Sequence, residues 1–275
     1  MRVLVTGANG YIGRWVVRAL LDRGVQVVAA DIRKCAAEGV ESFVGDILSV
    51  STEQIKELGN LDAVIHLAWQ DGFNHQADSH IDNLGKHVHF IKNLAAVGCT
   101  NVSVMGSMHE IGYYEGCVTA DTPCKPMLNY GIAKVALRQC LELMADHGEI
   151  NLKWLRAFYI MGDDEHNQSI FSKIIAWEKE GRETFPFNSG RNKYDFIHVW
   201  DLGRQISNAA VQTDICGIIN VCSGKPVQLK DQVDMFLQER RFKIRPEYGK
   251  FPDRPYDSPA IWGDNALINR IEGRM

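Results

Sequence analysis

The chain of 275 residues lacks any long hydrophobic run and any excess of positive charge. No apolar stretch approaches the roughly 20 residues that cross a bilayer, so we expect no membrane-spanning helix. Lysine and arginine number 30 against 34 aspartates and glutamates, a formal net charge of −4. That balance gives no reason to expect nucleic acid or a membrane surface as a partner. The apolar content of 45% is ordinary for a globular protein, and the length suffices for one domain with a small appendage.

The cysteines lack the spacing of a metal site or of a disulfide framework. Seven are present, an odd number, and no two of them form a C-x-x-C pair. We therefore expect reduced thiols, no bound metal and a cytoplasmic location. Because a strand pattern begins within the first residues, we expect no signal peptide. Residues 271–275 read IEGRM, which resembles a protease cleavage sequence, so they are left out of the expected fold.

What the chain does have, at its start, is a strand pattern followed by a glycine-rich turn and a helix pattern. Residues 3–6 are mostly apolar, and glycine then recurs at Gly7, Gly10 and Gly13. This order predicts a dinucleotide-binding βα unit. Glycine allows a positive φ and lets the backbone approach a pyrophosphate, while the helix N-terminus offers free N–H groups. Asp31 follows 18 residues after Gly13, where a carboxylate can accept hydrogen bonds from the cofactor ribose.

Strand and helix patterns alternate along the chain. Continuous apolar runs predict strands that are buried on both faces of a parallel sheet. These runs lie at 3–6, 25–30, 41–46, 62–68, 101–107 and 151–158, with helix patterns at 74–97, 129–147, 169–180 and 228–240. The alternation predicts an α/β fold, a doubly wound parallel sheet of the Rossmann type with a small C-terminal substrate-binding lobe. We expect the NAD(P)-binding domain over residues 1–160 and the lobe over residues 161–270, interleaved with strands that return to the sheet.

A tyrosine and a lysine are spaced for one face of a helix. Tyr130 and Lys134 stand at positions i and i+4, so both side chains can point into one site. A phenol titrates near pH 10, and lowering its pKa by ~3 units requires ~4 kcal/mol, which a neighbouring ammonium helps to supply. Ser107 ends the fifth expected strand, at the edge of the sheet where open α/β sheets bind ligands. We therefore expect Ser107, Tyr130 and Lys134 to form a catalytic set around one substrate oxygen.

Together these motifs resemble the extended short-chain dehydrogenase/reductase family, which comprises NAD(P)-dependent nucleotide-sugar epimerases, dehydratases and reductases. The likeness rests on TGANGYIG, GDI at 45–47, HLA at 66–68, the catalytic set and YDFIHVWDL at 194–202. It implies that Ser107 orients the substrate oxygen, that Tyr130 is the acid/base, and that Lys134 holds the nicotinamide ribose. It also implies a set of cofactor-binding residues. These are Gly7, Asn9, Gly10, Tyr11, Ile12, Gly13, Asp31, Ile32, Arg33, Asp46, Ile47, Leu67, Ala68, Trp69, Asn83, Tyr130 and Lys134.

The resemblance also indicates where a nucleotide sugar binds. Arg254 opens the segment RPYDSPAIWGD, which is similar to an epimerase pattern whose arginine grips the substrate pyrophosphate. His109 stands where related epimerase-reductases place an acid/base cysteine. Tyr159 replaces an asparagine of the family, and Arg191 lies near Tyr194, which replaces a family arginine. The expected substrate contacts are Ser107, His109, Tyr159, Arg191 and Arg254.

The first interpretation is an oxidoreductase that reduces the C4 ketone of a nucleotide-linked 4-keto-6-deoxy sugar. The stretches SMHEIGYYEG and TPCKPMLNYGIAK resemble dTDP-4-keto-6-deoxyglucose reductases, whereas Met108 and His109 replace the Asp-Glu pair of 4,6-dehydratases. Two alternatives stay open, an NAD-dependent 4-epimerase and an NAD(P)-binding regulatory protein without turnover. Asp31 favours NADH, while Arg33 and Lys34 leave NADPH open. We expect a homodimer with a nucleotide sugar as substrate.

Overall fold

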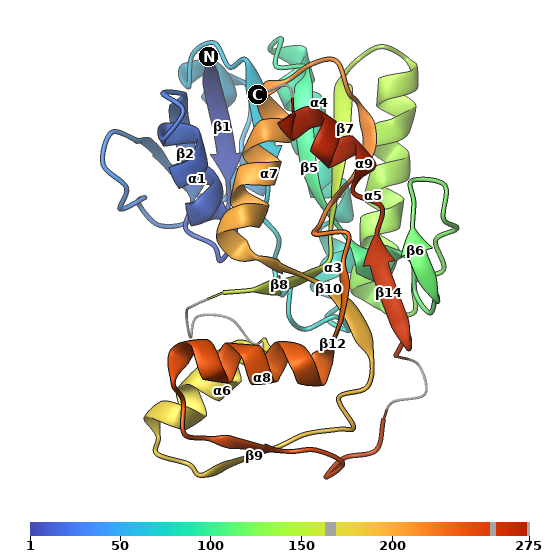
Figure 1. Cartoon of the computed structure of the whole chain (residues 1–275). Helices are drawn as coiled ribbons and strands as arrows, with labels where there is room; N and C mark the ends of the chain where they lie inside the picture. Colours follow the sequence, from blue (N-terminus) through green and yellow to red (C-terminus); the bar gives the residue numbers. More distant parts are fainter. Residues whose placement is uncertain (163–168, 254–256, 274–275) are drawn as a thin grey trace.

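The computed structural model describes residues 1–162, 169–253 and 257–273, and its core is a parallel sheet of seven strands (Figure 1). Neighbouring strands follow the order β11-β7-β5-β4-β1-β2-β3. The strands are β1 (Arg2–Thr6), β2 (Gln26–Asp31), β3 (Glu41–Val44), β4 (Ala63–His66), β5 (Asn101–Ser107), β7 (Asn151–Ala157) and β11 (Gly217–Val221). The chain moves outward from β1 in one direction and then from β4 in the other. This order confirms the doubly wound α/β prediction and creates a switch point between β1 and β4.

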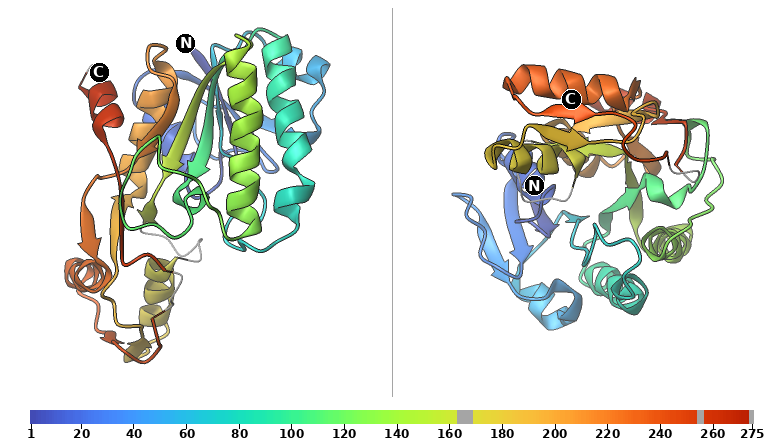
Figure 2. Two further views of the ribbon diagram at one scale, coloured as in Figure 1. Left: turned by 90° about the vertical axis from the view of Figure 1, so that its right-hand side faces the viewer. Right: turned by 90° about the horizontal axis from the view of Figure 1, so that it is seen from below.

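Helices cover both faces of this sheet, because successive side chains of a strand point to opposite faces. Val3 and Val5 of β1 pack with one layer of helices, and Leu4 packs with the other layer. The first layer consists of α1 (Gly13–Leu21), α7 (Val199–Val211) and α9 (Ala266–Glu272); the second consists of α2 (Thr52–Glu57), α4 (Leu84–Ala96) and α5 (Asn129–Asp146). Figure 2 shows α5 and α7 on opposite sides of the sheet. Burial on both faces explains why the strands read as continuous apolar runs. Within the described part of the chain, no helix is long and apolar enough to cross a bilayer.

The last helix belongs to the packed core. Residues 271–275 were left out of the expected fold, yet Ile271 is only 1% exposed and Glu272 ends α9. The carboxylate of Glu272 accepts a hydrogen bond from Asn208 and forms an ion pair with Arg204, both on α7. These contacts fasten α9 to the first helix layer.

A smaller lobe lies at the carboxyl ends of the sheet strands (Figure 1). Its main sheet runs β12-β10-β14-β6, with β8 also paired to β10, and a separate ribbon pairs β13 with β9. The strands are β6 (Gly116–Val118), β8 (Tyr159–Met161), β9 (Thr184–Pro186), β10 (Lys193–His198), β12 (Pro226–Gln228), β13 (Arg245–Glu247) and β14 (Ala260–Gly263). Helices α6 (Ile170–Lys179) and α8 (Leu229–Arg240) cover these strands. The lobe has its own core, in which Phe171 packs on Phe196 and Phe236.

The buried carboxylate of Asp195 ties three segments of the lobe together. Asp195 lies on β10 and accepts hydrogen bonds from the backbone N–H of Ser223 at 2.8 Å and of Gly224 at 2.9 Å. It also accepts from the Ser223 hydroxyl at 2.6 Å and from the backbone N–H of Gly263 on β14 at 3.1 Å. One side chain therefore joins β10, β14 and the turn that follows β11.

The prediction of one helix over 74–97 was wrong at its start. The short helix α3 (Ser79–Asp82) comes first, and α4 begins only at Leu84. The preceding residues form a loop, in which Asp71 has a φ of 56° and accepts a hydrogen bond from the Ser79 hydroxyl at 2.6 Å. The loop folds back on itself because His80 shares a hydrogen bond with the Asn74 carbonyl. Contacts of this kind leave no periodic pattern in the sequence, so the loop could not be told from a helix.

Candidate active site

The glycine-rich turn brings backbone against backbone at the carboxyl end of β1. Gly7 has a φ of 66°, and a Cβ there would lie 2.9 Å from the backbone nitrogen of Ala68. A Cβ on Gly13 would collide with the carbonyl oxygen of Gly7. Tyr11 and Ile12 complete the turn, and α1 begins at Gly13 without a side-chain cap. The N–H groups of Arg14 and Val16 already donate to the carbonyls of Gly10 and Ile12. The close backbone approach that Gly7 permits is therefore the feature that suits this turn to a dinucleotide pyrophosphate.

A cavity of about 630 Å³ opens beside this turn. It is lined by most of the predicted cofactor-binding residues, and Tyr11, Ile12 and Gly13 adjoin it through the turn. The predicted residues that line it are Gly7, Asn9, Gly10, Asp31, Ile32, Arg33, Asp46, Ile47, Leu67, Ala68, Trp69 and Asn83. A cavity that runs from the end of β2 across the switch point suits an extended dinucleotide.

Asp31 is held at the end of β2 by the backbone around it. Its carboxylate accepts hydrogen bonds from the N–H of Asn9 at 3.0 Å and of Arg33 at 3.3 Å. The Asn9 amide in turn donates to the Arg33 carbonyl at 2.8 Å. These bonds leave carboxylate lone pairs that can accept from ribose hydroxyls.

Five further residues line the cavity that the predicted set did not include: Ala30, Gly45, Leu48, Gln70 and Lys86. The Asn83 amide donates to Gln70 Oε1 at 3.1 Å and accepts from Lys86 Nζ at 2.9 Å. Lys86 lies in the first turn of α4, three residues after Asn83 and on the same face. The spacing of three residues from Asn83 could have indicated that Lys86 also faces the cavity. An ammonium beside the cavity suits a phosphate.

Ser107, Tyr130 and Lys134 come together at the carboxyl end of β5. Lys134 is 3% exposed, and its Nζ donates to the Met105 carbonyl at 2.8 Å. Burial lowers the pKa of Lys134 to about 7. Burial also raises the pKa of Tyr130 to about 12, although a hydrogen bond with Ser107 acts to lower it. Both side chains thus resist carrying a charge in this site.

Aromatic rings surround the tyrosine and the lysine. The Lys134 ammonium lies 3.5 Å from the centre of the Trp69 ring and 5.7 Å from the centre of the Tyr130 ring. Trp69 stacks on His87 at 4.4 Å and donates from its indole N–H to His80 at 3.0 Å. The indole therefore lies between the cavity and α5, the helix that carries Tyr130 and Lys134.

Two histidines border the phenol ring of Tyr130. The His75 ring stacks on the Tyr130 ring at 4.9 Å, and the His109 ring meets His75 edge-on at 4.3 Å. Burial lowers the pKa of His75. The sequence reading assigned His75 and His80 no role at the site, because their neighbours are set by the loop before α3. In the described residues, no group of three or more His, Cys, Asp or Glu side chains could hold a metal ion.

The remaining predicted substrate residues lie in the lobe or beyond the described part. Tyr159 on β8 stacks on Tyr194 at 4.0 Å, and burial raises its pKa. Arg191 is exposed in the loop before β10, where its backbone N–H donates to the Ser189 hydroxyl. Arg254 lies outside the described residues.

The amino-acid sequence matches the model of the "NAD dependent epimerase/dehydratase family" over residues 3–222. It is similar to dTDP-6-deoxy-L-talose 4-dehydrogenase (NAD(+)) of Aggregatibacter actinomycetemcomitans, with 46% identity over 96% of this chain and 99% of that protein. It is 27% identical to dTDP-4-dehydro-6-deoxyglucose reductase of Escherichia coli, over 84% of this chain and 79% of that protein.

Solved structures share the whole architecture. MoeE5 in complex with UDP-glucuronic acid and NAD is 25% identical, with a TM-score of 0.82 over 99% of this chain and 93% of that one. UDP-N-acetylglucosamine 4-epimerase from Methanobrevibacter ruminantium M1 has a TM-score of 0.85 at 21% identity, over 98% and 91% of the two chains. The second likeness is one of fold alone.

Proposed function

This chain belongs to the NAD-dependent epimerase/dehydratase family, and on that premise we propose that it interconverts the C4 hydroxyl and the C4 ketone of a dTDP-linked 6-deoxy sugar. The family resemblance predicted from the motifs is confirmed. The protein is an NAD-dependent oxidoreductase that modifies a nucleotide sugar. The dTDP moiety, the 6-deoxy sugar and the C4 position are the proposal.

One observation carries the proposal. Tyr130 lies beside Lys134, Ser107 acts to lower its pKa, and its ring meets that of Trp69, which lines the cavity, edge-on at 6.0 Å. A single hydroxyl or carbonyl oxygen can reach both Ser107 and Tyr130, which is the requirement for oxidation or reduction at that carbon. The name of the 46% identical relative supports C4 of a dTDP-6-deoxy sugar as that carbon.

Tyr130 moves the proton at the C4 oxygen. When bound, the nicotinamide supplies or accepts the hydride. In the direction of oxidation the phenolate of Tyr130 takes the hydroxyl proton, and in the direction of reduction the phenol returns it. Lys134, with its ammonium 5.7 Å from the phenol ring, favours the phenolate by its charge. Ser107 donates a hydrogen bond to the same oxygen and keeps it within reach of Tyr130.

The chain's own residues would also hold the dinucleotide. The turn at Gly7 and Gly10 fits the pyrophosphate, Asp31 accepts from the adenosine ribose, and Lys134 donates to the nicotinamide ribose. Trp69 and Leu67 would exclude water from the part of the cavity between the two riboses. We propose NAD(H) as the preferred cofactor, since Asp31 repels a 2′-phosphate.

The direction of reaction that the sequence favoured is opposite to the direction in the name of the 46% identical relative. The sequence favoured reduction of a 4-keto sugar, whereas the 46% identical relative is named as a dehydrogenase, and its name does not confirm reduction. Both reactions pass through the same transition state. We therefore propose that the protein catalyses either direction, according to the concentrations of substrate and cofactor.

The test is incubation of the purified protein with matched pairs of sugar and cofactor. dTDP-6-deoxy-L-talose with NAD⁺ should give the 4-keto sugar and an equal amount of NADH. The corresponding 4-keto sugar with NADH should run the reaction backwards. GDP- and UDP-linked analogues serve as controls for the nucleotide, and the Tyr130→Phe variant serves as the inactive control. Interconversion of C4 epimers without net change in NADH would point to a 4-epimerase, and cofactor binding without any turnover would point to a regulatory protein.

A further inference from the structure

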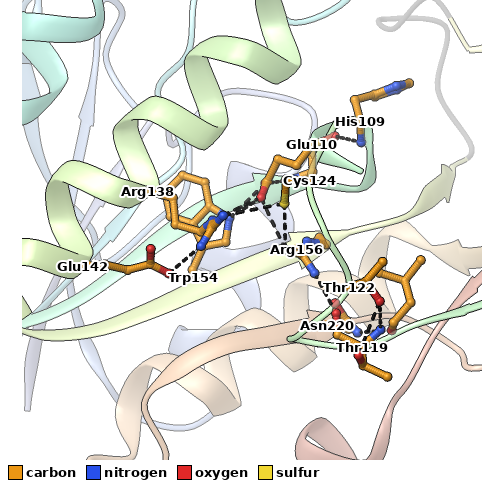
Figure 3. Close-up of polar contacts among 12 residues, drawn as sticks. His109, Glu110, Thr119, Thr122, Cys124, Arg138, Glu142, Trp154, Arg156 and Asn220 are labelled. Carbon is orange, nitrogen blue, oxygen red and sulfur yellow. Dashed lines mark hydrogen bonds and ion pairs between the residues drawn. The ribbon is translucent and has the colours of Figure 1, made fainter. Parts of the chain in front are cut away.

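Glu110 is a buried carboxylate directly behind the reaction site, and the proposed mechanism does not use it. It ends the 3-10 helix η2 (Met108–Glu110), which follows Ser107 without a gap, and its side chain is fully buried. Figure 3 shows this carboxylate among side chains from α5 and β7. A buried carboxylate is stable only when opposite charge and hydrogen bonds compensate for its loss of hydration. Each of its two oxygens should therefore have polar or charged partners.

One oxygen fixes the backbone that carries Ser107. Glu110 Oε1 accepts from the backbone N–H of Ser107 at 2.7 Å and from the indole N–H of Trp154 at 2.9 Å. The Ser107 hydroxyl accepts in turn from the N–H of His109 at 3.2 Å. A Cβ on Gly106 would lie 2.8 Å from Glu110 Oε1, so the glycine makes room for the carboxylate. These reciprocal bonds hold the turn from Ser107 to Glu110 in one conformation.

The other oxygen faces two guanidinium groups. Glu110 Oε2 lies 3.6 Å from Arg138 Nε and 3.5 Å from Arg156 Nη2. Arg156 is fully buried on β7 and also donates to the Thr119 carbonyl at 3.1 Å. Arg138 lies on α5 one turn after Lys134 and forms a second ion pair with Glu142 at 2.6 Å. The carboxylate thus links its own turn to α5 through Arg138 (Figure 3). That turn begins at Ser107, and α5 also carries Tyr130 and Lys134.

We propose that Glu110 is a positioning residue for the reaction, which sets the Ser107 hydroxyl against Tyr130 and supplies negative charge behind the catalytic helix. The expected effects on kcat and on the pH profile rest on the proposed function, whereas the expected effect on the Lys134 titration does not. Its effect passes through Ser107 and the charged groups, since Glu110 itself is fully buried. The charged, titratable and polar groups around its carboxylate come from two elements and one loop. They are Tyr130, Lys134 and Arg138 on α5, Trp154 and Arg156 on β7, and Cys124, which contacts both guanidinium groups.

The charge of Glu110 acts on both titrating groups of the catalytic helix. It raises the pKa of Lys134, against the larger lowering by burial. It also adds to the raising of the Tyr130 pKa by burial. Removal of this charge should therefore move both titrations to lower pH, a shift that a purely structural role would not cause.

Two substitutions separate position from charge, and a third is the control. Glu110→Gln keeps an Oε1 that can accept from Ser107 and Trp154 but removes the charge. Glu110→Ala removes both. Glu142→Gln also takes one carboxylate from Arg138, yet it lies on the outer side of that arginine and 38% of its side chain is exposed. The titration of Lys134 is followed by NMR of the full chain labelled with ¹³C-lysine, with Lys134→Met to identify its resonance, and kcat, KM and the pH profile are measured on the dTDP sugar.

We expect Glu110→Gln to shift the Lys134 midpoint and the pH profile downward by about half a unit or more. Glu110→Ala should lower kcat about 10–100-fold with little change in KM for NAD, because Ser107 is then misplaced. If Glu110→Ala does not fold, Glu110→Gln decides alone. A Lys134 midpoint and a pH profile in Glu110→Gln equal to those of Glu142→Gln would overturn the proposal. A wild-type protein without turnover would refute the proposed function, while the NMR titration would still test Glu110.

Discussion

Tyr130 and Lys134 lie in a site that disfavours the charges that the proposed proton transfer requires. The pKa of Tyr130 is about 12 and that of Lys134 is about 7, and burial is the main cause in each case. At neutral pH the phenol is therefore ready to give a proton, whereas the phenolate needs added positive charge beside it. The Trp69 ring, 3.5 Å from the ammonium, favours the charged form of Lys134 through its π face. Because oxidation requires the phenolate and reduction requires the phenol, the rates of the two reactions should differ in how strongly they depend on pH.

Tyr130→Phe tests the proton transfer directly. The substitution removes the hydroxyl and keeps the ring stacked on His75. We expect kcat to fall by about 10²–10⁴-fold, as is typical for loss of general acid–base catalysis, with little change in NAD affinity. Steady-state kinetics and a titration of NAD binding provide the two measurements. A kcat close to that of the wild type would exclude Tyr130 from the proton transfer.

Asp31→Ala tests the choice of cofactor. The carboxylate, held by the N–H groups of Asn9 and Arg33, repels a 2′-phosphate, whereas the Arg33 side chain beyond it attracts one. The wild type should therefore use NADH at least as well as NADPH, and Asp31→Ala should shift kcat/KM toward NADPH. Strong preference of the wild type for NADPH would mean that Arg33 and Lys34 dominate. Asp22→Ala, on the exposed end of α1, is a suitable control.

At the scale of elements, the sequence predicted the alternating strands and helices, but it did not predict the contacts made by the loop before α3. Each predicted strand of the first domain overlaps an observed one. In all of them except the partly exposed edge strand β3, burial on both faces leaves a mostly apolar run in the sequence. The loop before α3 has no such pattern, so His75 was not expected beside Tyr130. Glu110 was missed for a related reason: its partners Arg138 and Arg156 are distant in sequence and belong to other elements. Residues within one motif are readable from spacing, whereas a buried charge cluster is not.

The hydrogen bonds of Asp195 should make it a main determinant of stability in the lobe. In Asp195→Asn the amide nitrogen cannot accept from Ser223, Gly224 or Gly263, so one side of the carboxylate loses its partners. We expect the free energy of unfolding to fall by about 3 kcal/mol, the scale of one or two charge-assisted hydrogen bonds. Denaturant unfolding compares this variant with Asp121→Asn, an exposed control. Equal stability of the two variants would mean that the lobe is held by its aromatic core alone.

At the scale of the whole molecule, the buried Lys134 links stability to pH. Its pKa falls from 10.5 to about 7 in the fold, so between these values the folded state binds fewer protons than the unfolded chain. The free energy of unfolding should therefore rise with pH through this window, by up to about 4–5 kcal/mol from this group. The relevant measurement is the difference between the wild type and Lys134→Met, followed by denaturant unfolding near pH 6.5, 8 and 9.5. A difference that stays constant would show that Lys134 keeps its proton in the folded state.

Synthesis must reach α7, which ends at Val211, before the outer face of α1 can be covered. Val16, Val17 and Leu20 of α1 pack in the same core as Leu202 of α7 and Ile268 of α9. During synthesis the dinucleotide-binding unit therefore emerges from the ribosome with an uncovered apolar helix face. That face stays uncovered until α7 is made, which exposes it to chaperones and to neighbouring nascent chains. Polar substitutions on the face of α7 that packs on α1 should thus reduce the yield of protein able to bind cofactor, although α7 lies on the side of the sheet away from α5.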